Sequence, residues 1–203
     1  MEAIIRESTL DDMAFVIRQR LMSTQSFKPS EMPAAIMQIE DGDVYRGQET
    51  EDMLMEGTIK GFYSNDSIAS VKASAFVNNT KLTGVSLPNV THIWNMSFSG
   101  CKNLHSLYLP KVSYVESNAF YNCDSLKEVY LPKAQRIGLY AFYDCTNLEK
   151  IYLPSVREIG QTSFWNCNNL TDIYVGMSEE ECGGSEPLWK PTNATVHFNY
   201  KED

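Results

Sequence analysis

The cysteines are the residues whose type and spacing most directly suggest chemistry. Five occur in the 203-residue chain. Cys182 stands alone, and the other four recur every 22 residues: Cys101, Cys123, Cys145 and Cys167. Zinc sites need C-x-x-C pairs or nearby histidines, and this spacing provides neither. We therefore predict no metal and no cofactor. The spacing would permit a disulfide between neighbouring units, but we expect free, buried thiols that pack as small apolar side chains.

Catalytic patterns are missing from the sequence. His92, His105 and His197 fall at unrelated positions, and no G-x-S-x-G, H-E-x-x-H, P-loop or dinucleotide-binding motif occurs. A carboxylate pair for glycoside cleavage needs no motif, so that option stays open. We predict that the protein is not an enzyme.

Aromatic residues form two further columns at the same interval. The first consists of Tyr108, Tyr130, Tyr152 and Tyr174, and the second of Tyr121, Tyr143 and Trp165. Tyrosine and tryptophan supply large contact areas at low entropic cost, so both columns are candidate ligand- or partner-binding residues. The alternative is structural, because cross-strand aromatic pairs stabilise a sheet by roughly 0.2–1 kcal/mol each.

These columns belong to a repeat that extends over residues 82–175. The unit starts with alternating apolar residues, a proline ends this stretch, and an Ala/Ser-Phe pair follows. The pattern predicts a short parallel strand and a return half, stacked into a solenoid. The predicted core comprises Leu104, Leu126, Leu148, Phe98, Phe120, Phe142, Phe164 and the four periodic cysteines.

The unit resembles the BspA-type leucine-rich repeat, also called the Treponema-type repeat, over residues 71–175. This resemblance implies an open solenoid with a parallel sheet on one face. It also implies a binding or adhesion module rather than an enzyme.

The segments that flank the repeats complete an expected α+β organisation. Residues 1–52 are predicted to be a helical anchor or oligomerisation segment followed by an acidic linker, and residues 53–81 a capping half-repeat. Residues 176–203 are expected to form a C-terminal cap. Within it, Ser178 and the acids after it favour a helix start, and Trp189 should cover the last repeat.

Charge and the N-terminal segment suggest a location and partners. The net charge of −9 argues against nucleic-acid binding. The sequence has no 18-residue apolar run, so no membrane insertion is expected, and its start does not read as a signal peptide. Residues 12–18 and 27–36 resemble a leader of tail-associated proteins in phages and prophages of Gram-positive gut bacteria.

The two resemblances together imply a structural virion tail protein, made in the bacterial cytoplasm. It would bind a host-surface glycan or protein, contact other tail proteins, and form a homo-oligomer such as a trimer through its N-terminal segment. Two alternatives remain: a bacterial cell-surface adhesin module, and a purely architectural tail or baseplate subunit.

Overall fold

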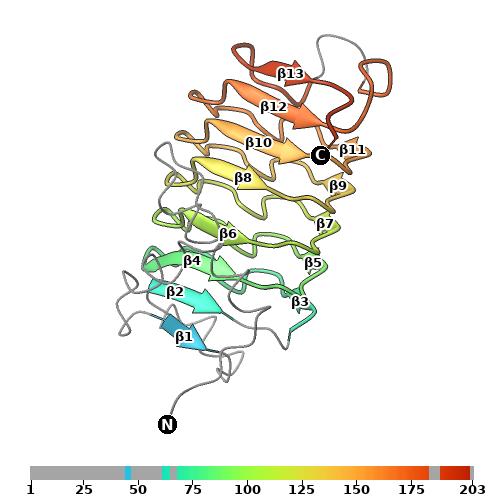
Figure 1. The fold of residues 1–203 in the computed structure, drawn as a ribbon. Helices are drawn as coiled ribbons and strands as arrows, with labels where there is room; N and C mark the ends of the chain where they lie inside the picture. Colours follow the sequence, from blue (N-terminus) through green and yellow to red (C-terminus); the bar gives the residue numbers. More distant parts are fainter. Residues whose placement is uncertain (1–43, 47–60, 65–67, 183–187, 202–203) are drawn as a thin grey trace, which may run out of the picture.

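The computed structural model describes residues 44–46, 61–64, 68–182 and 188–201. These residues form a parallel β-solenoid whose strands stack like rungs (Figure 1). The predicted repeat solenoid is confirmed. The helical part of the predicted α+β class is not, because the described residues contain strands and turns but no α-helix. The helical anchor predicted at the start of the segment 1–52 lies outside the described residues.

One side of the solenoid, the main face, carries the longer strands. They form two four-stranded parallel sheets, ordered β1-β2-β4-β6 and β13-β12-β10-β8, where we expected one sheet. The strands are β1 (Val44–Arg46), β2 (Gly61–Ser64), β4 (Leu82–Ser86), β6 (Ser106–Tyr108), β8 (Glu128–Tyr130), β10 (Lys150–Leu153), β12 (Asp172–Val175) and β13 (Thr195–His197). β1 lies inside the segment 1–52, predicted to be a helical anchor followed by an acidic linker.

The return half of each unit contributes a two-residue strand to a third sheet. Its order is β11-β9-β7-β5-β3, with every neighbouring pair parallel. The strands are β3 (Ser70–Val71), β5 (His92–Ile93), β7 (Tyr114–Val115), β9 (Arg136–Ile137) and β11 (Glu158–Ile159). Neighbouring strands pair residues 22 apart, as Val115 pairs with Ile137, so each sequence column becomes a column in space.

Alternation along the main-face strands decides which side chains enter the core. In β10, Ile151 and Leu153 are buried, whereas Lys150 and Tyr152 are only partly covered. The period of two in a strand produces this division, and Pro154 then ends the strand because proline cannot donate to the ladder.

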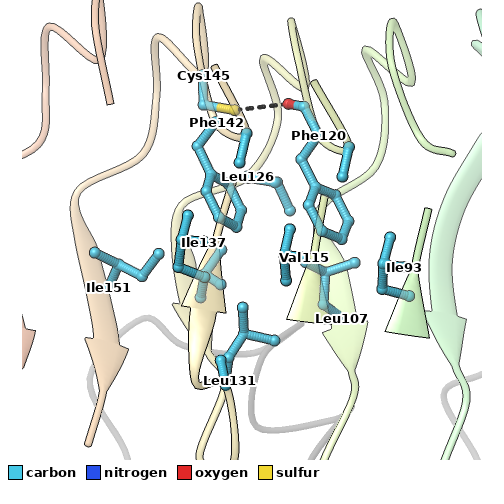
Figure 2. Packing of buried hydrophobic residues seen from close by; sticks show 14 of the residues in the cluster. Ile93, Leu107, Val115, Phe120, Leu126, Leu131, Ile137, Phe142, Cys145 and Ile151 are labelled. Atoms are coloured by element: carbon cyan, nitrogen blue, oxygen red, sulfur yellow. Dashed lines mark hydrogen bonds between the residues drawn. The ribbon is translucent and has the colours of Figure 1, made fainter. Parts of the chain in front are cut away.

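Phenylalanine rings form the central column of the core. Phe76, Phe98, Phe120, Phe142 and Phe164 are all buried. Successive ring centroids lie 4.9–5.7 Å apart, with interplanar angles of 5–17°. Figure 2 shows Phe120 and Phe142 beside the aliphatic columns. Each such pair contributes about 0.5–1.5 kcal/mol beyond the burial of apolar area.

The periodic cysteines are free and buried, as predicted, but they also link the repeats. Each thiol donates to the carbonyl of the phenylalanine 25 residues earlier, at 3.0–3.1 Å. The bond from Cys145 Sγ to the Phe120 carbonyl oxygen is drawn in Figure 2. Burial raises the pKa of the Cys101 and Cys167 thiols to about 12, so both keep the proton that they donate.

Each return half contains two residues in the left-handed backbone region. One column is Asn78, Gly100, Asn122, Asp144 and Asn166, residue types that tolerate positive φ. The other is Ser74, Met96, Asn118, Tyr140 and Thr162, with φ between 56° and 60°. The second column includes side chains that pay a conformational cost at such angles.

The C-terminal cap covers the apolar end of the last repeat. Trp189 is buried and packs edge-on against Phe164 at 6.0 Å, which confirms its predicted covering position. The expected helix after Ser178 is a single turn. The amide and the hydroxyl of Ser178 donate to Glu181 Oε2, and the Glu181 amide donates to Ser178 Oγ, as in a capping box.

Candidate binding surface

The predicted tyrosine column lies on the main face, where each tyrosine occupies the outward-facing position of its strand. Tyr152 and Tyr174 pair in register, as do Tyr130 and Tyr152. His197 pairs with Tyr174 and extends the column into the cap. We call this set the sheet stripe: Tyr108, Tyr130, Tyr152, Tyr174 and His197.

The C-terminal half of the sheet stripe is a stack of rings. Tyr152 and Tyr174 lie 4.5 Å apart at 5°, and Tyr174 and His197 lie 4.3 Å apart at 10°. Tyr200 leans over the stack, 5.9 Å from Tyr152 and 5.2 Å from Tyr174. Ring faces that cover one another are closed to a ligand, so this part of the stripe offers mainly ring edges and hydroxyl groups.

Charged side chains beside the sheet stripe alternate in sign along the sheet: Glu128, Lys150 and Asp172 are neighbours in register. His197 Nε2 lies 2.8 Å from Asp172 Oδ1. This bond and one from the Thr171 hydroxyl lower the pKa of Asp172. Burial raises the pKa of Glu128, whose carboxylate accepts a bond from the Tyr152 hydroxyl. Lys150 therefore offsets part of the negative charge of the two carboxylates.

The second predicted column lies on the turns of the return half. Tyr121 and Tyr143 stack at 5.2 Å and 3°, and Tyr140 meets Tyr143 edge-on at 5.7 Å. Trp165 is 56% exposed. We call this set the aromatic band: Tyr121, Tyr140, Tyr143 and Trp165.

A smaller aromatic group lies nearer the N-terminal end. His92 stacks on Trp94 at 4.1 Å and on Tyr114 at 5.2 Å. Its Nε2 is 3.2 Å from Glu116 Oε1. Trp94 and Tyr114 are more than one-third exposed, yet both rings are engaged by the imidazole between them.

The described residues contain little that resembles a catalytic or metal centre. They hold no group of three or more His, Cys, Asp or Glu side chains arranged to bind a metal. An open cavity of about 710 Å³ lies where the last repeat meets the cap, and neither aromatic set lines it. Its wall includes Gln135, Ser155, Arg157 and Glu181. In this part of the chain there is also no helix that could span a membrane.

Sequence reasoning missed three aromatic residues. His197 follows Tyr174 by 23 residues rather than 22, so a search at a fixed interval of 22 does not find it. The alternation of residue types over residues 195–197 could have indicated a strand there. Tyr140 lies outside both predicted columns, and its positive φ is visible only in the structure. Tyr200 reaches the stripe through the path of the cap, for which the sequence holds no periodic signal.

Three solved structures illustrate what the chain is similar to. A leucine-rich repeat protein of T. pallidum is 27% identical, with a TM-score of 0.55, covering 64% of this chain and 62% of that one. One from Bacteroides ovatus is 21% identical, with a TM-score of 0.57, covering 77% and 42%. The pneumococcal vaccine antigen PcpA is 17% identical, with a TM-score of 0.54, covering 68% and 36%.

The chain spans less than two thirds of the length of each of these structures. No curated protein matches it. A family model matches residues 55–183 in six copies, so it starts within the predicted capping half-repeat and extends into the cap. The chain therefore belongs to the family described as the BspA type leucine rich repeat region.

Proposed function

We propose that this chain is a non-enzymatic adhesion module, displayed at a bacterial cell surface, that binds a glycan or protein on the surface of a host. Leucine-rich repeat proteins of this family are typically non-catalytic binding proteins. A solenoid suits this role because its stacked repeats expose long continuous surfaces while the core stays between them.

The observation that carries the proposal is the amount of aromatic surface outside the core. Tyr140 and Trp165 are both more than one-third exposed. Tyrosine and tryptophan are the side chains that dominate binding energies at protein surfaces. Exposed aromatic clusters of this kind are typical of contact surfaces.

A virion tail role is the second candidate, and only the leader-like residues 12–18 and 27–36 favour it. They lie outside the described residues, and none of the three similar structures is described as a tail protein. In this version the N-terminal segment would form a homo-oligomer and contact other tail proteins. Light scattering on the full chain tests it: a trimer or larger oligomer supports the tail role, and a monomer counts against it.

Bead adhesion tests the main proposal. Beads coated with the full chain should bind cultured epithelial cells, and an excess of the soluble chain should displace them. Albumin-coated beads are the control for non-specific contact. Binding no greater than that of albumin beads would overturn the adhesion proposal.

A further inference from the structure

We propose that the aromatic band is the ligand site of this adhesion module and that its ligand is a chain of neutral sugar residues. The inference rests on the proposed function and names the surface and the chemical class that carry it out. The sheet stripe, in contrast, contributes mainly to the stability of the fold.

The backbone aligns the aromatic band into a row. The Asn122 amide donates to the Tyr143 carbonyl at 2.8 Å, and the Asp144 amide donates to the Trp165 carbonyl at 3.1 Å. These bonds hold the turns of successive repeats side by side, so Tyr121, Tyr143 and Trp165 occupy equivalent positions. The row advances by one aromatic residue per repeat.

Tyr121 and Tyr143 stack and Tyr140 meets Tyr143 edge-on, so the open ring of the aromatic band is that of Trp165. Trp165 has no ring contact among the described residues, and its indole is 56% exposed. Tyr140 is 37% exposed with φ at 56°, a conformation that costs a tyrosine free energy. Asn118, at the equivalent position one repeat earlier, would adopt this φ at lower cost. A large aromatic side chain at such a place is explained by contact with a ligand.

The three turns that carry the aromatic band contain little charge. In the three turns 117–122, 139–144 and 161–166, Asp144 is the only charged residue, and the Asn166 amide donates to it. The chain as a whole carries 21% charged residues, so these three turns are poorer in charge than the chain average. Because burying an unpaired charge is costly, turns with a single charged residue favour a neutral ligand.

Polar groups next to the rings match hydroxyl-rich partners. Asn122 follows Tyr121, Asn166 follows Trp165, and Thr162 and Gln161 precede it. Amides and hydroxyls both donate and accept hydrogen bonds, as sugar hydroxyls do. The negative face of an aromatic ring attracts the weakly positive C–H groups on the apolar side of a sugar ring. A row of ring-plus-polar units therefore suits a polymer that repeats the same two kinds of group.

Cell binding by the full chain and its variants tests the inference. We expect Trp165→Ala to weaken binding to cultured epithelial cells about tenfold, and Tyr140→Asn to weaken it by about threefold. Trp94→Ala, which removes an indole of similar exposure at the other aromatic group, is the matched control and should bind as the wild type does. Thermal unfolding of each variant checks that the fold is intact.

Treatment of the cells identifies the ligand class. Periodate, which cleaves vicinal diols in sugars, should abolish binding, whereas removal of sialic acids should leave it unchanged. Binding should also vary less than about twofold between 0.05 and 0.5 M salt, because a neutral ligand makes no screened ion pairs. On an oligosaccharide array, neutral glycans should retain the chain and sulfated ones should not.

Three results would overturn the inference. Binding that survives periodate but not protease would identify a protein partner. Equal losses in Trp165→Ala and Trp94→Ala would remove the aromatic band as the site. A preference for anionic glycans would contradict its neutrality. None of these three results contradicts the adhesion proposal. That proposal fails only if the wild-type chain does not bind cells.

Discussion

The sheet stripe and the aromatic band repeat with the same period, yet their rings have different surroundings. In the stripe, Tyr174 is stacked between Tyr152 and His197, and Tyr200 leans against it. In the band, Trp165 has no ring neighbour among the described residues and is mostly exposed. Ring faces paired within the chain, as in the stripe and between Tyr121 and Tyr143, thus indicate a stabilising ladder. An open ring such as that of Trp165 indicates a contact surface.

The charged residues beside the two surfaces also differ. Beside the stripe, Glu128, Lys150 and Asp172 alternate and are compensated by neighbours, which keeps the strands in register but occupies the groups that a ligand would need. Beside the band, Asp144 is the only charge in the three turns. The stripe is therefore expected to govern stability and the band to govern binding.

The largest expected effect is a difference in protein stability between a substitution in the sheet stripe and one in the aromatic band. Tyr174→Ala removes three ring contacts and should lower the free energy of unfolding by about 2–3 kcal/mol. Trp165→Ala removes an exposed side chain and should change it by no more than about 0.5 kcal/mol. Urea denaturation of both variants measures the difference. Similar losses in the two variants would show that the surfaces do not differ in this way.

The cysteine beneath the band should have the next largest effect. Cys145→Ala removes the thiol that bonds to the Phe120 carbonyl, leaving a buried acceptor with one partner fewer, and should destabilise the protein by about 1–2 kcal/mol. Cys182→Ala is the matched control, because this thiol lies in the cap outside the periodic column. A loss in the control as large as that in Cys145→Ala would argue against a role for the thiol–carbonyl bond.

A substitution at Tyr140 should separate binding from stability. Tyr140→Asn places at this position the residue type that Asn118 provides one repeat earlier, and asparagine tolerates positive φ. The gain in backbone energy should offset the lost contact with Tyr143, so the free energy of unfolding should stay equal or rise by about 0.5 kcal/mol. Calorimetric unfolding measures this, and a clear loss of stability would assign Tyr140 a structural role.

The smallest expected effect is the response of the stripe to acid. The pKa of Asp172 is lowered in the folded protein, so its contribution to stability is present above its ordinary pKa of about 3.9 and is lost as the pH falls through the lower, folded value. Asp172→Asn should therefore lose less stability than the wild type between pH 5 and pH 2. Thermal unfolding across this range provides the measurement.

Glu128→Gln is the companion variant with the opposite sign. Burial raises the pKa of Glu128, so protonation favours the folded state and partly offsets the loss at Asp172 as the pH falls. Without that offset, the variant should lose more stability in acid than the wild type. Identical acid responses of both variants and the wild type would exclude a role for these carboxylates.

Several features of the fold were predictable because stacked identical units convert sequence columns into spatial columns. The 22-residue interval predicted the parallel register, as in the pairing of Val115 with Ile137. It also predicted the phenylalanine stack and the free, buried cysteines. The apolar end of the last unit required a cover, which made Trp189 recognisable. These predictions needed only periodicity and the burial of apolar side chains.

The tertiary structure alone decided how the columns are used. By sequence alone, Tyr152 and Tyr143 are equivalent members of two columns. The path of the cap brings His197 and Tyr200 onto the first column and leaves Trp165 exposed in the second. The residues of the cap do not follow the 22-residue interval. The bond from each periodic cysteine to a phenylalanine carbonyl depends on how the turns stack. Period determines which residues align, whereas the packing of ring faces and turns determines which of them remain open to a partner.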